Sequence, residues 1–138
     1  GTDSHIGLDP KEELRILDYG QRLMSHKRNT FYSKSNGDSG LFGYAEALLS
    51  GKQAMSVKSV DSLTVGSFLD AVVIDVEHPL IATSSLERVL STYIYSGDSS
   101  FNLGTLVNGE WKAKGNRHFD AFEIGSTFSK ALRNLNLR

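Results

Sequence analysis

The chain has 138 residues, of which 39% are hydrophobic and 22% charged, the composition of an ordinary globular domain. Its 15 Lys and Arg nearly balance 16 Asp and Glu, so the net charge of -1 gives no electrostatic reason to expect nucleic acid or a membrane surface as a partner. The lack of cysteine excludes disulfides, thiolate metal sites and a cysteine nucleophile. We expect a cytoplasmic protein.

The first predicted element is a helix that follows a short polar turn. Residues 1–5 read Gly-Thr-Asp-Ser-His and place the carboxylate of Asp3 among small side chains. Asp9 can then cap a helix that has Pro10 at its first position, and the glutamate three residues after the cap completes a capping box. The apolar residues that follow recur at helical spacing over residues 10–26; they are Leu14, Ile16, Leu17, Leu23 and Met24.

More helices than strands follow. A second helix is expected from about Ser39 to Leu49, where Ser50-Gly51 would supply a left-handed cap. The remaining expected elements are a buried strand at 71–74, a helix from Ser84 that buries Leu86, Val89, Leu90, Tyr93 and Ile94, a hairpin turning at Asn108-Gly109, and a helix from about Asp120. This order predicts an α/β fold with too few strands to cover its helices.

Candidate site residues are few when judged on the residues alone. Asp3 fits a turn-forming or capping residue better than a catalytic one. The histidines at 5, 26, 78 and 118 lack the spacing of two, three or four that would place a metal-binding pair on one strand or helix face. The glycines of residues 40–51 lack the Gly-Lys-Ser/Thr ending of a phosphate loop. The residues alone therefore specify no function.

Three segments together resemble the C-terminal part of the metal-dependent amidohydrolase superfamily. Residues 1–4, Gly-Thr-Asp-Ser, are similar to the turn after the eighth barrel strand, where the family places an aspartate metal ligand. Residues 61–79, DSLTVGSFLDAVVIDVEHP, resemble the pattern that returns the chain from the barrel to a small β-sandwich. Residues 106–118, LVNGEWKAKGNRH, resemble the hairpin near the end of these proteins.

Two further segments resemble one family within this group, the formimidoylglutamate deiminases, which release ammonia from N-formimino-glutamate in histidine degradation. They are EELRILDYGQRLMSHKRN at 12–29 and GNRHFDAFEIGSTFSKALRNL at 115–135. The stretch from Tyr19 to Arg22 is the most specific part. Ser62, Leu69 and Asn116 depart from the pattern, but they lie in the sandwich segment.

The resemblance implies the C-terminal fragment of a TIM-barrel hydrolase. Residues 1–56 would form the end of the metal-dependent barrel, and residues 57–138 part of a composite β-sandwich with a terminal helix. Asp3 would be both metal ligand and catalytic carboxylate, supported by Ser4 and His5, with zinc as the expected divalent metal. The histidine ligands and the substrate-binding residues would precede Gly1, so we expect this chain alone to be inactive.

Two alternatives stay open. One is another deaminase or chlorohydrolase of the superfamily, acting on guanine or a related compound. The other is a free-standing, non-catalytic interaction module that closes its own core. The hydrolase hypothesis expects a small-molecule substrate and, as partner, the missing N-terminal part of the same enzyme; a homodimer is compatible with it. It also predicts exposed apolar helix faces and unpaired strand edges.

Overall fold

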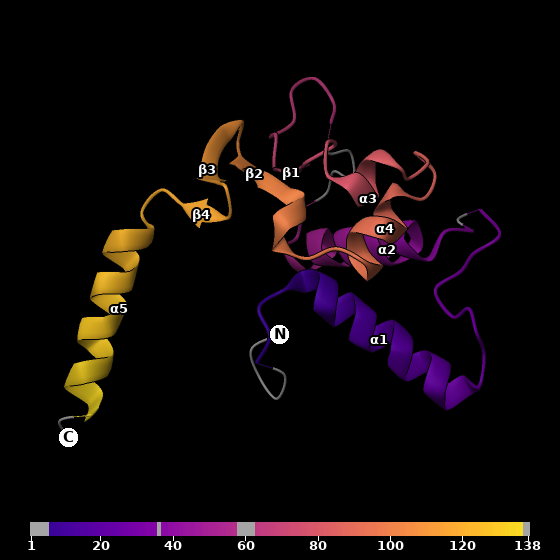
Figure 1. Cartoon of the computed structure of the whole chain (residues 1–138), viewed down its shortest axis with the longest axis horizontal. Coiled ribbons are helices and arrows are strands. Elements are labelled where there is room, and N and C mark those ends of the chain that lie inside the picture. Colours follow the sequence, from indigo (N-terminus) through magenta and orange to yellow (C-terminus); the bar gives the residue numbers. More distant parts are fainter. Residues whose placement is uncertain (1–5, 36, 58–62, 137–138) are drawn as a thin grey trace. The chain divides into compact units, whose positions relative to one another are not determined.

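The chain folds into helices and one antiparallel sheet (Figure 1). A computed structural model describes residues 6–35, 37–57 and 63–136. The chain divides into two compact units, one of residues 1–61 and 76–101, the other of 62–75 and 102–138. The predicted α/β class is confirmed, whereas the barrel, the sandwich and the boundary between residues 56 and 57 stay predictions. Within the described residues, no helix has the length and apolar character needed to span a membrane.

The first unit is helical, and its two long helices begin where the sequence predicts. α1 (Pro10–Ser25) starts after Asp9, whose carboxylate accepts a hydrogen bond from the main-chain N–H two residues on, at 3.0 Å. α2 (Ser39–Ala54) starts after Asp38, whose carboxylate caps the helix in the same manner at 2.8 Å. Each cap satisfies a main-chain donor that has no partner inside its helix.

Three short helices complete this unit: α3 (Pro79–Ala82), α4 (Val89–Tyr95) and the 3-10 helix η1 (Ser99–Phe101). The α2 helix meets α4 closely at Gly40, whose N–H donates to the Ser91 hydroxyl at 2.9 Å. A Cβ added to Gly40 would lie 2.4 Å from the Ser91 nitrogen, so only glycine fits there. The buried apolar side chains of the described residues are few; they are Ile81, Tyr93, Ile94 and Phe101.

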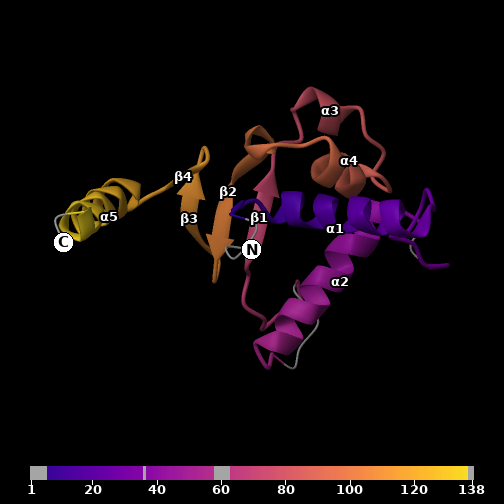
Figure 2. The same ribbon diagram turned by 90° about the horizontal axis from the view of Figure 1, so that it is seen from below.

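In the residues that the structure describes, the second unit consists of a four-stranded sheet and one helix. The strands pair antiparallel in the order of the chain, and Figure 2 shows the first three side by side. They are β1 (Ala71–Ile74), β2 (Asn102–Val107), β3 (Glu110–Lys114) and β4 (Arg117–His118). Positive φ angles at Asn108 (51°) and Gly109 (77°) form the tight turn that the sequence predicts. The helix α5 (Ala121–Asn136) begins one residue from its predicted start.

The predicted end of α2 is wrong. The helix runs through Gly51 to Ala54, and an added Cβ on Gly51 would meet nothing within 4 Å. The left-handed conformation occurs instead at Ser56, where φ is 58°. Glycine at an exposed helix position is tolerated at modest cost, and so it does not by itself mark a terminus.

The predicted helix start at Ser84 is also wrong. The Ser84 hydroxyl donates to the Leu80 carbonyl at 2.7 Å and lies 2.7 Å from the Thr92 hydroxyl. Because its hydroxyl bonds to α3 and contacts α4, Ser84 does not cap a helix of its own. The next helix, α4, begins only at Val89. Leu86, which the capping pattern would have buried, is 90% exposed.

Candidate functional site

The residues predicted to carry the chemistry, Asp3, Ser4 and His5, lie outside the described residues. The described chain begins at Ile6 and enters α1 four residues later. The part of the site that the structure describes is therefore the start of α1 and the contacts that hold this helix.

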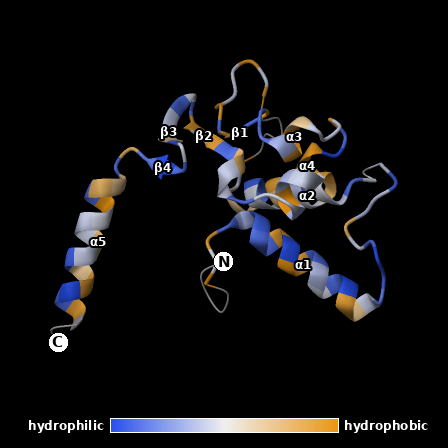
Figure 3. Ribbon diagram, viewed as in Figure 1, coloured by the Kyte–Doolittle hydropathy of each residue, from blue (hydrophilic) through white to orange (hydrophobic). Residues whose placement is uncertain are grey.

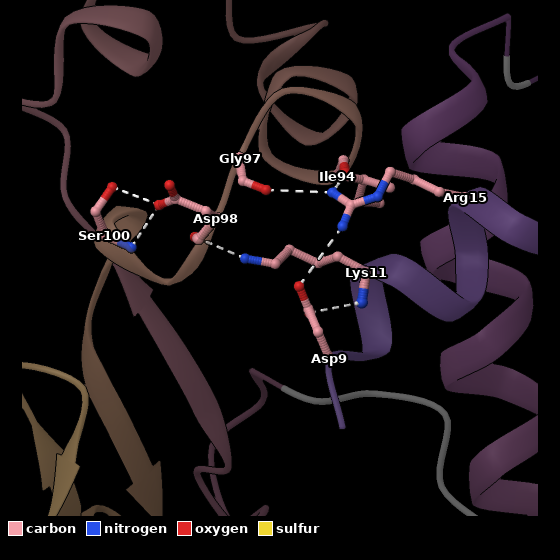
Figure 4. Close-up of polar contacts among 7 residues, drawn as sticks. All are labelled: Asp9, Lys11, Arg15, Ile94, Gly97, Asp98 and Ser100. Atoms are coloured by element: carbon pink, nitrogen blue, oxygen red, sulfur yellow. Dashed lines mark hydrogen bonds and ion pairs between the residues drawn. The ribbon is translucent and has the colours of Figure 1, made fainter. Parts of the chain in front are cut away.

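Two cations in the first turns of α1 bind main-chain carbonyls at the end of α4 (Figure 4). Lys11, only 6% exposed, donates from Nζ to the Asp98 carbonyl at 2.7 Å. Its ammonium also lies 4.7 Å from the centre of the Tyr93 ring, a cation–π distance. Arg15 Nη1 donates to the Ile94 carbonyl at 2.8 Å and also to the Gly97 carbonyl at 3.2 Å. The start of α1 is thus attached by charge-assisted hydrogen bonds.

The turn that receives these cations is itself held by local contacts. The Asp98 carboxylate accepts hydrogen bonds from the Ser100 N–H at 2.7 Å and the Ser100 hydroxyl at 2.6 Å. These bonds hold the pKa of Asp98 below its usual value. A Cβ on Gly97 would lie 2.4 Å from the Tyr93 carbonyl oxygen, so the chain passes too closely there for any side chain. The turn that supplies the acceptor carbonyls is therefore closely packed and internally hydrogen-bonded.

A buried carboxylate holds the middle of α1. Asp18 is fully buried, accepts hydrogen bonds from the Thr30 hydroxyl at 2.6 Å and the Tyr95 hydroxyl at 2.8 Å, and forms an ion pair with Arg22. The Arg22 guanidinium lies 5.7 Å from the Tyr19 ring centre and 5.9 Å from that of Tyr95. A buried charge is tolerated only when it is paired and hydrogen-bonded in this way.

This buried pair changes the acidity of its tyrosine partner. Burial, reinforced by the hydrogen bond to Asp18 and by its negative charge, holds the pKa of Tyr95 well above the ordinary value of a tyrosine. The hydroxyl stays protonated at neutral pH and donates to the carboxylate. We interpret this network as an anchor for α1 rather than as catalytic machinery.

The α1 helix consequently presents its apolar face outward. At roughly 100° per residue, the four charged anchors Lys11, Arg15, Asp18 and Arg22 occupy an arc of about 60°. By the same arithmetic the exposed apolar residues lie on the opposite side. Figure 3 marks the hydrophobic residues of α1 in orange along its ribbon. Their exposed fractions are large; they are 47% for Ile16, 54% for Leu17, 77% for Leu23 and 80% for Met24.

The described residues do not hold a metal by themselves. No three His, Asp or Glu side chains among them lie close enough together to bind an ion. His26 ends α1, and His118 lies 3.8 Å from the Asp120 carboxylate. His78 caps α3, and its ring centre lies 4.0 Å from that of Phe101, with the two rings tilted by 40°. These three histidines thus have separate structural positions.

Hollows border these elements in the described part of the chain. A mostly apolar pocket of about 440 Å³ lies at the start of α1, lined by Gly7, Leu8, Asp9, Pro10, Glu13, Leu14 and Ala47. A larger open cleft of about 920 Å³ lies between α4 and the start of α2; its lining is rich in hydroxyl groups and includes Asp38, Glu87, Arg88, Ser91, Thr92 and Tyr95.

The anchors of α1 were not identified from the sequence. Their positions, 11, 15, 18 and 22, follow helical spacing, so a charged stripe opposite the apolar one was visible. Such a stripe is usually a solvated face, and only the structure shows that it packs against α4 and residue 98.

Comparison with known proteins identifies relatives of this chain. No protein-family model matches it. Formimidoylglutamate deiminase of Pseudomonas aeruginosa is 33% identical over 135 residues, which is 98% of this chain and 30% of that protein. The crystal structure of an amidohydrolase from Brucella melitensis superimposes with a TM-score of 0.83 at 32% identity, over 98% of this chain and 29% of the other.

The two comparisons agree in how much of each chain is covered and in the type of protein that is matched. Each aligns with nearly all of this chain, while the chain spans about a third of the length of each relative. The solved structure is similar over 98% of this chain, which corresponds to 29% of that structure's chain. The resemblance to the C-terminal part of an amidohydrolase-superfamily enzyme is therefore confirmed.

Proposed function

We propose that this chain is the C-terminal part of a metal-dependent hydrolase that deaminates an amidine-type substrate, with N-formimino-L-glutamate as the specific substrate. The support is the similarity to a deiminase over 98% of the chain. Because the second relative is named only as an amidohydrolase, another deaminase or chlorohydrolase of the superfamily, acting on guanine or a related compound, is the alternative.

The structural observation that supports a larger enzyme is the outward apolar face of α1. A helix of a free-standing module would turn Leu17, Leu23 and Met24 toward its own core, yet these side chains are 54–80% exposed while Lys11 and Asp18 are buried. In a TIM barrel each outer helix packs on the strands. We propose that α1 is the eighth barrel helix and that the rest of the same enzyme covers this face.

The sheet of the second unit also supports the proposal that the rest of the same enzyme is the partner of this chain. β1 pairs with β2 on one side, and among the described residues no strand pairs with its other edge. An apolar edge strand of sequence Ala-Val-Val-Ile is a ready template for another strand. We propose that a strand from the remainder of the enzyme completes this sheet as a β-sandwich.

Asp3 is the proposed catalytic residue of this part. A divalent metal, proposed to be zinc, would be held by Asp3 and by histidines outside this chain, and would supply a water of lowered pKa. The Asp3 carboxylate would accept a proton from the water whose oxygen adds to the amidine carbon, and would return that proton to the nitrogen as the carbon–nitrogen bond breaks and ammonia leaves. Ser4 and His5 would orient the carboxylate from the adjoining positions.

The proposal is tested by measuring ammonia release from N-formimino-L-glutamate. We expect turnover by the enzyme that contains this chain together with the proposed remainder, and none by the chain alone. Asp3→Asn should lower kcat about 10²-fold or more, because it removes the proton acceptor. Asp120→Asn, a matched change at an exposed aspartate of the second unit, should leave kcat unchanged. Zinc-supported turnover by the chain alone that Asp3→Asn abolishes would overturn the assignment to a larger enzyme.

A further inference from the structure

We propose that Asn108 is a site of spontaneous deamidation, and that the residues just before β1 keep this site closed while the sheet is folded. The proposal concerns a covalent modification of the second unit and does not depend on the proposed hydrolase function. Three observations support it: Asn108 is followed directly by glycine, both residues are exposed, and their two N–H groups bond to Leu69 and Asp70.

The chemistry requires only the chain, hydroxide and water. The main-chain nitrogen of Gly109 loses its proton to hydroxide and attacks Cγ of the Asn108 side chain. A five-membered imide forms as the side-chain nitrogen takes a proton from water and leaves as ammonia. Water then opens the imide at either carbonyl, which leaves aspartate or isoaspartate at position 108. Glycine favours this ring closure because it has no Cβ to obstruct the attacking nitrogen.

In the folded sheet the attacking nitrogen is already engaged. The Gly109 N–H donates to the Leu69 carbonyl at 2.8 Å, so its proton faces that carbonyl rather than solvent hydroxide. The neighbouring Asn108 N–H donates to Asp70 Oδ1 at 2.8 Å. Both acceptor residues directly precede β1, so these bonds continue the pairing of β1 with β2 beyond the first residue of β1.

The conformation of the turn also opposes ring closure. The φ angles of 51° at Asn108 and 77° at Gly109 lie in the left-handed region, where the next nitrogen is nearly opposite Cβ. Ring closure requires rotation about the Cα–C bond of Asn108 until this nitrogen comes alongside Cβ. The same rotation would turn the Gly109 N–H away from the Leu69 carbonyl. Deamidation therefore requires local opening of the hairpin tip, and its rate reports how often residues 69–70 release it.

Either product would weaken the closed tip. Isoaspartate carries the main chain through its side-chain carbon and lengthens the turn by one atom, which a two-residue turn between paired strands does not accommodate. Aspartate adds a negative charge to the residue whose N–H binds the Asp70 carboxylate, and like charges repel. Deamidation at Asn108 is therefore a lasting covalent record that residues 69–70 have released the tip.

The test follows deamidation of this chain in mildly alkaline buffer by mass spectrometry and by enzymatic methylation of isoaspartate. We expect the reaction at Asn108 to be roughly tenfold or more slower in the folded chain than in guanidinium chloride. Asp70→Ala removes the acceptor of the Asn108 N–H and should accelerate the reaction in the folded chain about three- to tenfold. Asp120→Ala, a matched change at an exposed aspartate of the same unit, should alter it less than about twofold.

Two further variants identify the site and guard against misfolding. Asn108→Gly suits the same turn but has no amide, so the isoaspartate signal of the hairpin peptide should disappear. Asp70→Asn serves if Asp70→Ala does not fold by Trp111 emission, because it keeps an oxygen acceptor without the charge and should give a smaller acceleration.

Three outcomes would overturn the proposal. Equal rates in the folded and denatured wild type would show that the turn gives no protection. An unchanged rate in a folded Asp70 variant would remove the role of the residues before β1. No reaction at Asn108 in the denatured chain would show that this residue is not a deamidation site.

Discussion

The helices α1 and α5 have the same length, sixteen residues, and similar apolar stripes, yet they differ in what holds them. α1 is fixed through its charged face, with Lys11 and Asp18 buried. α5 has no buried residue among those described, and Phe122, Ile124, Phe128 and Leu132 are 44–81% exposed. The amphipathic pattern of a helix therefore shows that the helix has an apolar face. It does not show whether the apolar or the charged face packs against the rest of its own unit.

The largest expected effect is a difference in the loss of stability when an acidic residue is removed from each helix. Asp18→Ala should destabilise the first unit by about 3–5 kcal/mol, because Arg22 loses its buried partner and two hydroxyls lose their acceptor. Glu123→Ala, at an exposed position of α5, should change stability by less than about 0.5 kcal/mol. Denaturation followed by circular dichroism measures both. Similar losses would show that the α1 anchor is no stronger than a surface charge.

A second experiment sharpens the comparison through pH. Tyr95→Phe should cost the first unit about 0.5–1.5 kcal/mol at neutral pH, because it removes the hydrogen bond to Asp18. The pKa of Tyr95 is raised in the folded state, so its contribution is complete below the unfolded pKa of about 10. Above that pH the unfolded tyrosine ionises while the folded one stays protonated, and stability falls.

Hydrogen exchange measures this pH effect helix by helix. Between pH 9 and 11, α1 of the wild type should lose protection more steeply than α1 of Tyr95→Phe. Protection of α5, which contains no tyrosine, should be the same in both proteins. Parallel loss of protection in α1 of wild type and variant would argue against the Tyr95 contact as an anchor.

The smallest expected effect concerns one glycine in each helix that has open space beside it, Gly20 in α1 and Gly125 in α5. An added Cβ at Gly20 or Gly125 would meet nothing within 4 Å, so alanine at either should stabilise this chain by about 0.5–1 kcal/mol. Gly20 lies amid the apolar face of α1, so in the proposed enzyme Gly20→Ala should instead destabilise by crowding the strands. Gly40→Ala is the matched contrast, since it clashes with Ser91 even in this chain. Stabilisation by Gly20→Ala in the enzyme would contradict the packing of α1 on a barrel.

Local signals in the sequence predicted most of the fold. The caps at Asp9 and Asp38 and the turn at Asn108-Gly109 depend on a few adjacent residues, and each element starts or turns where these residues indicate. The short β4 and α3 were missed because two to four residues carry too little pattern. Ser84 misled because its hydroxyl has tertiary partners.

The candidate site was less accessible from the sequence. The acceptors of Lys11 and Arg15 and the tyrosine that binds Asp18 lie 77 to 87 residues away along the chain. No periodicity within α1 reveals such partners, although it reveals the charged stripe. The role of Asp3 rests on resemblance to a family, and it stays a prediction.

The placement of the aromatic residues gives each unit its own optical signal. The single tryptophan, Trp111, lies in β3 over Gly104, where its ring would be 2.8 Å from an added Cβ, and the Lys114 ammonium lies 4.7 Å from the ring centre. All five tyrosines belong to the other unit. Emission excited at wavelengths that only indole absorbs therefore follows melting of the sheet alone. Tyrosine fluorescence follows the helical unit. A single fluorescence experiment can therefore distinguish sequential from concerted unfolding of the two units.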